Sequence, residues 1–473
     1  MNKIKLIDLL SKTFIPIGCF LVIAIRIAQI WLNPVDDYDT SSFVLMVQGG
    51  FYPKTMFFFD IAHPGLLAGL INVCHLIQAS TSLSPIYIWS TLITFGFLFA
   101  FVCLFQLMKA LGCSFQLASL SCLFYSLSPS IADVAARSEE NILFHGPFIL
   151  AIWACISYVR RQSIKSIIFL LLSALLLSAL HAQPFVIICG GLFLFLCSEF
   201  LKARNIIINN LNIALKVFAI FSITGFLYYF VMHYAFYNPM IVKAYSNNFY
   251  SLLHNDSYVR YLQAYLLFAQ GFVLTGELPV NYATVTGVDP RTSIWLLGII
   301  VLTFALYLTA RRRLVDCFVL PALGFVFLYE PSASERWDTF AIALIISLVS
   351  RLAVIDNNKF PASKKYAWCL VAMLFVLNVF SLWGQVNQIF ITLGAQNVIR
   401  NALDGTKVVF ADTDSARSLI SLSPRGIQLR NIESEKPLPG DAIYLKAGTF
   451  VAINKFNLNC QPTKVSGLCL IGN

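Results

Sequence analysis

Residues 83–108 read LSPIYIWSTLITFGFLFAFVCLFQLM, a stretch with no charged side chain. A helix needs about 20 apolar residues to cross the hydrocarbon core of a bilayer, so this stretch is long enough to span one. Comparable apolar runs cover 115–131, 142–159, 164–180 and 185–201. Over all 473 residues only 12% are charged, about half the share in soluble domains. The sequence therefore predicts an all-α polytopic membrane protein.

The distribution of basic residues orients the predicted helices. With the N-terminus inside, seventeen Lys and Arg residues fall in inner segments and six in outer loops, as the positive-inside rule requires. Because these residues lie at span ends and form no single patch, the net charge of +10 does not indicate a nucleic-acid partner. The first span is expected to be an uncleaved signal anchor, and its Arg26 is the one obvious charge deep in a span. The eleven expected spans are 14–32, 84–108, 115–131, 142–159, 164–180, 185–201, 213–236, 293–310, 314–329, 337–354 and 366–383.

One apolar stretch, His63–Ala79, is left out of this count. It contains two histidines, an asparagine and a glutamine, which is an unusual polar content for a lipid-embedded helix. Counting it as a twelfth span would also move the later basic clusters to the outside. We therefore expect a juxtamembrane helix in the outer interface. A second outer helix is expected at 257–276, within the loop 237–292.

The chain is expected to divide into a membrane domain, residues 1–383, and a small outer α/β domain, residues 384–473. Strand-like segments at 407–412, 441–447 and 449–453 and a helix-like segment at 414–422 are separated by Pro and Gly turns in the second part. Ten of the twelve cysteines lie in or beside apolar segments, where they are expected to pack as small hydrophobic groups. Cys460 and Cys469 lie in the tail, and a disulfide between them is an open possibility if the tail faces an oxidising compartment.

Acidic residues near the outer ends of spans are the first candidates for chemistry. Asp36, Asp37 and Asp39 follow the first span, and three carboxylates at a membrane surface could hold a divalent cation or act as a general base. The alternative is a solvated acidic loop that helps to orient the span. Asp60 and His63 lie in the same loop and could join a metal or phosphate site.

A second acidic pair, Glu139 and Glu140, lies beside Arg137 at the start of the fourth expected span. These carboxylates are either functional or part of an ordinary helix start, with Ser138 as the N-cap and the acids in the first turn. The two readings carry equal weight.

Two basic positions complete the set on the predicted outer face. His181 lies in the turn between the fifth and sixth spans, and Arg336 precedes the tenth span next to Trp337. An arginine at a membrane surface can hold a phosphate through paired N–H donors, although interfacial anchoring is the simpler explanation for Trp337. Each motif is weak alone, but the predicted topology places all of them on one face.

In their order along residues 14–355 these motifs resemble the GT-C superfamily of membrane glycosyltransferases, which includes protein O-mannosyltransferases and the aminoarabinose transferases that act on lipid A. Three of the motifs differ in detail from the usual family pattern: Glu replaces Asp in the second acidic motif, His63 stands where Lys is frequent, and Trp337 where Tyr is common. The motifs that carry the resemblance are Asp36-Asp37, Asp60 with His63-Pro64, Glu139-Glu140-Asn141-Ile142-Leu143-Phe144, and Arg336-Trp337.

The resemblance implies an enzyme that transfers a sugar, with inversion, from a polyprenyl-phosphate carrier to a lipid, glycan or protein acceptor outside the membrane. Asp36 would be the general base, supported by Asp37, and Glu139 or Glu140 would orient the acceptor or help to bind a divalent metal cation. The remaining implied roles are donor-phosphate binding by His63, Arg336 and His181, and metal binding by Asp60 and His63.

Two other function classes stay open. A transporter or flippase of lipid-linked sugars would carry its polar residues deep in the spans. A polysaccharide polymerase or ligase would use Arg and His in a large outer loop, such as 237–292. In each case the expected location is a bacterial inner membrane, with the active site on its outer face.

Overall fold

The computed structural model describes residues 3–32, 38–49, 65–81, 83–203, 208–236, 313–329, 337–354, 382, 386–387, 389–403, 405–420, 427–445 and 460–471. Its membrane part contains the helices α1 (Lys3–Leu32), α2 (Tyr38–Gln48), α3 (Leu66–Thr81), α4 (Pro85–Ala110), α5 (Phe115–Leu127), α6 (Pro129–Arg137), α7 (Asn141–Arg161), α8 (Ile164–Leu180), α9 (Ala182–Ala203), α10 (Ile208–Phe236), η2 (Leu314–Phe318), α15 (Val319–Tyr329) and α16 (Trp337–Val354). Its C-terminal part contains β1 (Val408–Ala411), α18 (Thr413–Ile420), β2 (Gln428–Asn431), β3 (Ala442–Tyr444), β4 (Cys460–Pro462) and β5 (Leu468–Ile471).

The chain is an integral membrane protein. Among the described residues five helices are long and apolar enough to cross a membrane, or six if the bent pair α5 and α6 forms one span. Helices occupy every predicted span that falls on described residues. The predicted spans 293–310 and 366–383, and the outer loop 237–292, lie outside the described residues apart from position 382. The stretch predicted as a juxtamembrane helix forms α3, which has 16 residues.

Local sequence explains where the helices begin and end. Proline occupies the first turn of α4, where a missing N–H costs no helical hydrogen bond, and Gly112 follows its end with a φ of +88°. Ser114 caps α5 by accepting a hydrogen bond from the backbone N–H of Leu117. Ser163 and Ser166 form a reciprocal capping box at the start of α8.

The predicted span 115–131 is not one straight helix, because Pro129 has no N–H to continue the helix. The chain bends by 61° between α5 and α6, which frees carbonyl groups at the end of α5. The buried Arg26 of α1 donates from Nε to the freed carbonyl of Ser126 at 2.6 Å and from Nη1 to the Gln29 side chain at 2.6 Å. This arginine therefore caps the negative end of the α5 dipole inside the bundle.

A buried carboxylate fixes the opposite end of the bundle. Asp316 of η2 is fully buried and accepts hydrogen bonds from Arg313 at 2.9 and 3.0 Å and from Arg351 of α16 at 2.6 Å. Ser347 of α16 donates to the same carboxylate at 2.5 Å. Two of the basic residues that were predicted to be inside therefore meet at one end of α16.

The C-terminal part forms a five-stranded sheet with the strand order β2-β1-β3-β5-β4. The pairs β1–β2 and β1–β3 are parallel, whereas β3–β5 and β4–β5 are antiparallel. The predicted segments at 407–412, 414–422 and 441–447 became β1, α18 and β3. The strand expected at 449–453 lies outside the described residues.

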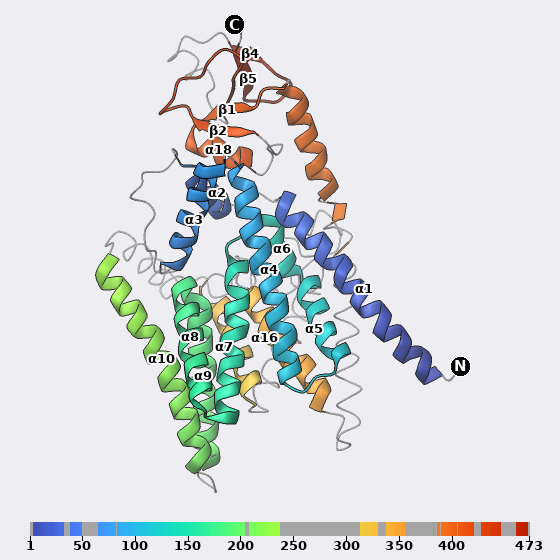
Figure 1. Ribbon diagram of the computed structural model, residues 1–473, viewed down its shortest axis with the longest axis vertical. Helices are drawn as coiled ribbons and strands as arrows, with labels where there is room; N and C mark the ends of the chain where they lie inside the picture. Colours follow the sequence, from blue (N-terminus) through green and yellow to red (C-terminus); the bar gives the residue numbers. More distant parts are fainter. Residues whose placement is uncertain are drawn as a thin grey trace, which may run out of the picture.

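This sheet packs on one end of the helical bundle, where α18 contacts α2 (Figure 1). Because side chains alternate along a strand, Val409 and Ala411 join the hydrophobic core that continues into the membrane helices. Phe410, between them, belongs to a separate small core on the other face together with Ile443 and Cys469. The tail is therefore seated on the bundle through one face of its sheet.

Cys469 of β5 is disulfide-bonded in this second core, whereas the described cysteines of the membrane part are free thiols. Cys460 begins β4, the strand paired with β5. We predict that Cys460 is the partner. Tryptic mapping of the membrane-extracted protein without reductant should give one linked peptide pair that reduction separates. Cys469→Ser should lower the free energy of unfolding of the sheet by roughly 2–3 kcal/mol, the chain-entropy value for so short a loop.

Blocking free thiols before extraction is the necessary control, because it prevents the bond from forming during purification. A pair that appears only in unblocked samples would contradict the prediction. A pair that survives blocking would place the tail in an oxidising compartment, since such bonds are rare in the cytosol.

Candidate functional site

The acidic pair Glu139 and Glu140 lies in the tight turn that joins α6 to α7. Both side chains are buried, with exposed fractions of 2% and 6%. Glu139 lies 3.5 Å from Nε of Arg137 and accepts a hydrogen bond from the Asn141 side-chain amide at 3.1 Å. Two carboxylates buried at a helix start are costly to maintain, which is typical of a functional site in a membrane bundle.

Ser138 shapes this turn, but it does not act as the N-cap of α7 as the alternative reading supposed. Its backbone is left-handed, with a φ of +51°, and it ends α6. Its hydroxyl donates to the carbonyl of Ile30 near the end of α1, and its own carbonyl accepts from the indole of Trp89 at 2.9 Å. The acidic turn is thereby fixed against α1, six residues before Asp36 in the sequence.

A buried hydrogen-bonded triad lies one helical turn below the acids. Nε2 of His145 is 2.7 Å from the Asp338 carboxylate, and its Nδ1 is 2.9 Å from the Tyr125 hydroxyl. All three side chains are fully inaccessible. The buried triad joins α5, α7 and α16 near the starts of the latter two helices. It therefore ties the acidic turn to the helix that begins immediately after Arg336.

His181 lies between α8 and α9, where it is buried against the same region. Its ring packs on Phe144 of α7, with centroids 4.8 Å apart. Its Nδ1 accepts a hydrogen bond from the backbone N–H of Gln183 at 3.1 Å, which satisfies one donor at the start of α9. The Gln183 side chain lies 3.5 Å from Thr339, next to the triad. His181 thus lies beside Phe144 in the first turn of α7, and one of its ring nitrogens has a structural function.

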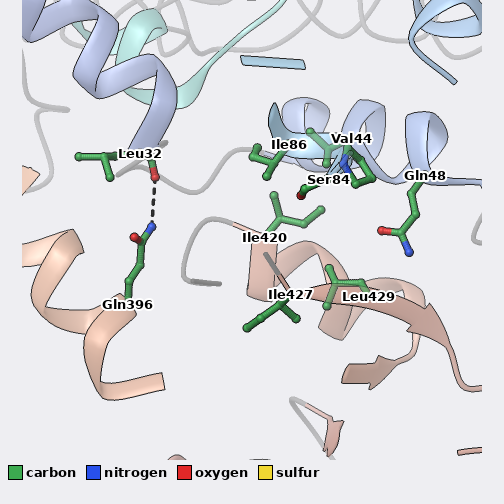
Figure 2. A pocket seen from close by; sticks show the side chains of 10 residues that line it. Leu32, Val44, Gln48, Ser84, Ile86, Gln396, Ile420, Ile427 and Leu429 are labelled. Atoms are coloured by element: carbon green, nitrogen blue, oxygen red, sulfur yellow. Dashed lines mark hydrogen bonds between the residues drawn. The ribbon is translucent and has the colours of Figure 1, made fainter. Parts of the chain in front are cut away.

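A small cleft opens between the seated sheet and the ends of the membrane helices. Figure 2 shows Ile420, Ile427 and Leu429 on the sheet side facing Val44 and Ile86. The amide of Gln396 donates to the carbonyl of Leu32 at 3.4 Å, where α1 ends. The cleft has no charged residue among its lining residues. It lies beside the point where the chain enters the segment containing Asp36 and Asp37.

The described residues include only part of the predicted site. Asp36, Asp37, Asp60, His63 and Arg336 lie outside them, so their assigned functions stay predictions. Within the described ranges no three His, Cys, Asp or Glu side chains are grouped closely enough to hold a metal ion. The predicted divalent cation, with Asp60 and His63 as ligands, therefore stays a prediction as well.

Sequence reasoning missed the buried triad. Arg26 was the one charge expected deep in a span, and the structure adds a fully buried carboxylate, Asp338, in the first turn of α16. The signal was present, since His145 interrupts the apolar run 142–159 and Asp338 is the second residue of the predicted span 337–354. An ionisable residue within a span is by itself a reason to look for a partner.

No protein-family model matches the chain, and no curated protein matches it. Among solved structures, the chain is similar to ArnT from Cupriavidus metallidurans bound to undecaprenyl phosphate. The match covers 97% of each chain, with 8% sequence identity and a TM-score of 0.49. Similarity at this level does not assign a ligand or site residues to the chain.

Proposed function

We propose that this protein is a membrane glycosyltransferase that moves a sugar from a polyprenyl-phosphate carrier to an acceptor at the outer face, with inversion. One observation carries the proposal: hydrogen bonds join residues that lie close in sequence to three separate candidate motifs. Ser138, beside the acidic pair, bonds to Ile30 before Asp36. His145, after the acidic pair, bonds to Asp338, two residues after Arg336.

The chemistry assigned to these residues is a single displacement at the sugar. The Asp36 carboxylate takes the proton of an acceptor hydroxyl while that oxygen attacks the anomeric carbon. The bond from this carbon to the phosphate oxygen breaks, and the bonding electrons leave with the phosphate. Arg336 stabilises the charge that develops there, and His63 and His181 are the supporting donors. Attack opposite to the leaving phosphate inverts the anomeric configuration.

Glu139 and Glu140 are assigned to orienting the acceptor. Both are buried at the start of α7, where the fixed position of the turn makes their carboxylates suitable hydrogen-bond acceptors for hydroxyl groups. The uncharged cleft beneath the sheet borders the chain entering the Asp36 segment. We assign acceptor entry to this side, and lateral entry of the carrier lipid to the bilayer side.

A transporter of the intact donor is the second candidate, and the buried triad favours it. Polar groups deep in a bundle and a span broken by a bend, as between α5 and α6, are typical of transport pathways. Such a protein would move the lipid-linked sugar without breaking the bond between sugar and phosphate. The two candidates therefore differ in whether free carrier phosphate is produced.

The deciding experiment uses the full-length protein in liposomes that contain a radiolabelled polyprenyl-phosphate sugar. We expect free polyprenyl phosphate to accumulate in proportion to sugar transferred to acceptors in a membrane extract, because transfer cleaves the donor. Protein-free liposomes with the same extract are the control. Movement of label across the bilayer with no free carrier would establish the transporter, and neither event with any donor would reject both proposals.

A further inference from the structure

Arg26 of α1 is a fully buried cation, and no described carboxylate forms an ion pair with it. It lies six residues before the end of α1, about 9 Å from that end along the helix axis. Among the described residues its hydrogen bonds go to the carbonyl of Ser126 and to the side chain of Gln29, which are both neutral groups. A guanidinium group among lipid-embedded helices is costly unless its charge is balanced. The position of Arg26 therefore calls for an anionic group close to it.

The helix ends at the break between α5 and α6 do not supply that balance. The end of α5 carries about half a negative charge, to which Nε of Arg26 already donates through Ser126. The start of α6 follows at Pro129 and carries about half a positive charge. Its N-cap residue, Ser128, makes no side-chain capping bond, and the Ser128 hydroxyl instead lies 3.2 Å from that of Ser130. The break therefore presents a full cation beside a partly positive helix start.

Three donor groups around this guanidinium have no hydrogen-bond partner within the described part of the chain. They are Nη2 of Arg26, Nε2 of Gln29 and the hydroxyl of Ser126, and all three side chains are fully inaccessible. Nη2 lies on the same edge of the planar group as Nε, so it faces the break between α5 and α6. The Gln29 amide cannot be turned over, because Nη1 of Arg26 requires its oxygen at 2.6 Å. Each missing bond costs free energy, most of all at the charged group.

The charge and the number of donors together indicate the kind of ligand that fits. A water molecule accepts at most two hydrogen bonds and leaves the Arg26 charge unbalanced. A divalent anion such as phosphate would exceed the single positive charge, and its oxygens outnumber the three donors. We infer that Arg26, Gln29 and Ser126 form a buried binding site for one small monovalent anion of the halide class, beside the start of α6. This site holds the break between α5 and α6 against α1, and it does not depend on the proposed sugar transfer.

The test measures thermal unfolding of the full-length protein in lipid nanodiscs while sodium chloride replaces sodium gluconate at constant ionic strength. Gluconate is too large for a site formed by three buried side chains, so chloride alone can fill it. Exposure of buried thiols such as Cys19 and Cys122 to a reactive dye reports unfolding. The midpoint should rise with chloride concentration, by roughly 5 °C at a hundredfold excess over the dissociation constant. A midpoint that does not depend on chloride would overturn the inference.

Two variants locate the site. Gln29→Glu places a carboxylate of the same size next to Arg26, so this protein should unfold in gluconate at the temperature of the wild type in saturating chloride. Added chloride should then have no further effect. Ser126→Ala removes one donor and should weaken the apparent affinity for chloride about tenfold, as expected for one hydrogen bond to a charged group. A full chloride response in Gln29→Glu, or wild-type affinity in Ser126→Ala, would place the anion elsewhere and reject the site.

Arg161→Gln is the matched control, because it also removes a cation, but an exposed one at the end of α7. It should keep the wild-type rise with chloride, since salt screens the attraction of anions to exposed charges. Loss of the rise in this variant would show that chloride acts on surface charge, and the inference would be rejected. Crystals grown in sodium bromide should also show an anomalous peak next to Nη2 of Arg26. Peaks at exposed basic side chains alone would contradict the assignment.

Discussion

Replacing Asp36 with asparagine is expected to lower the rate of donor cleavage at least about 100-fold, because asparagine cannot accept the proton of the acceptor hydroxyl. The side chains have nearly the same size, so the folded yield and the affinity for undecaprenyl phosphate should change little. The measurement is the initial rate of polyprenyl phosphate release in liposomes at saturating donor. A loss of rate with unchanged binding would identify a group that acts in the transition state.

Two neighbouring acids serve as controls for this prediction. Asp37→Asn should give a smaller loss, because Asp37 is assigned to support and not to proton transfer. Asp39→Asn makes the same chemical change three residues further on, in the first turn of α2, and should remain within about threefold of the wild type, as for a residue outside the reaction. Full activity of Asp36→Asn would remove its assignment as the base. Equal losses in all three variants would indicate a general effect of loop charge.

The second large effect is expected on stability, at Asp316. Asp316→Asn should lower the free energy of unfolding by about 3–5 kcal/mol, because it leaves Arg313 and Arg351 without a counter-ion at a buried position. Ser347 would also lose its charged acceptor. Reversible unfolding in mixed micelles, followed by circular dichroism, measures the change. Undecaprenyl phosphate binding by the remaining folded protein should be normal, since the cluster lies at the far end of α16.

Glu435→Gln is the control for removing one carboxylate from an ion pair. Glu435 forms an exposed ion pair with Arg430, and the two side chains are 53% and 41% exposed, respectively. Such ion pairs contribute less than about 1 kcal/mol to the free energy of unfolding. If Asp316→Asn lowers the free energy of unfolding no more than Glu435→Gln does, the two arginines find other partners or water in the variant. The large predicted effect depends on burial of the charge.

Much of the membrane architecture could be predicted from the sequence, because apolar length and charge at span ends are local properties. Each predicted span from 84–108 to 213–236, except 115–131, begins and ends within five residues of one helix, namely α4, α7, α8, α9 or α10. The bend between α5 and α6 was missed, although Pro129 lies inside the predicted span 115–131. Its effect depends on Arg26, a residue 100 positions away from Ser126 that satisfies the freed carbonyl.

The sequence indicated candidate residues for a site, but it could not indicate their contacts. Motif order pointed to Glu139 and Glu140, and burial of both at a helix start agrees with a special function. The bond between His145 and Asp338 joins residues 193 positions apart, and only tertiary packing brings them together. Ser138 illustrates the same limit, because its sequence context suggested an N-cap whereas its hydroxyl bonds to α1. The periodicity of apolar residues in the sequence does not show which distant side chains form hydrogen bonds with each other.

The bond from Gln396 to Leu32 has a consequence for biosynthesis. It joins residues 364 positions apart, and the seated sheet adds contacts between α18 and α2. At about 5–20 residues per second, the ribosome needs tens of seconds to make the intervening chain. During that interval the end of α1 and the apolar face of α2 lack their final cover. The nascent chain therefore has an incomplete surface at this end of the helical bundle until the last-made residues fold and cover it.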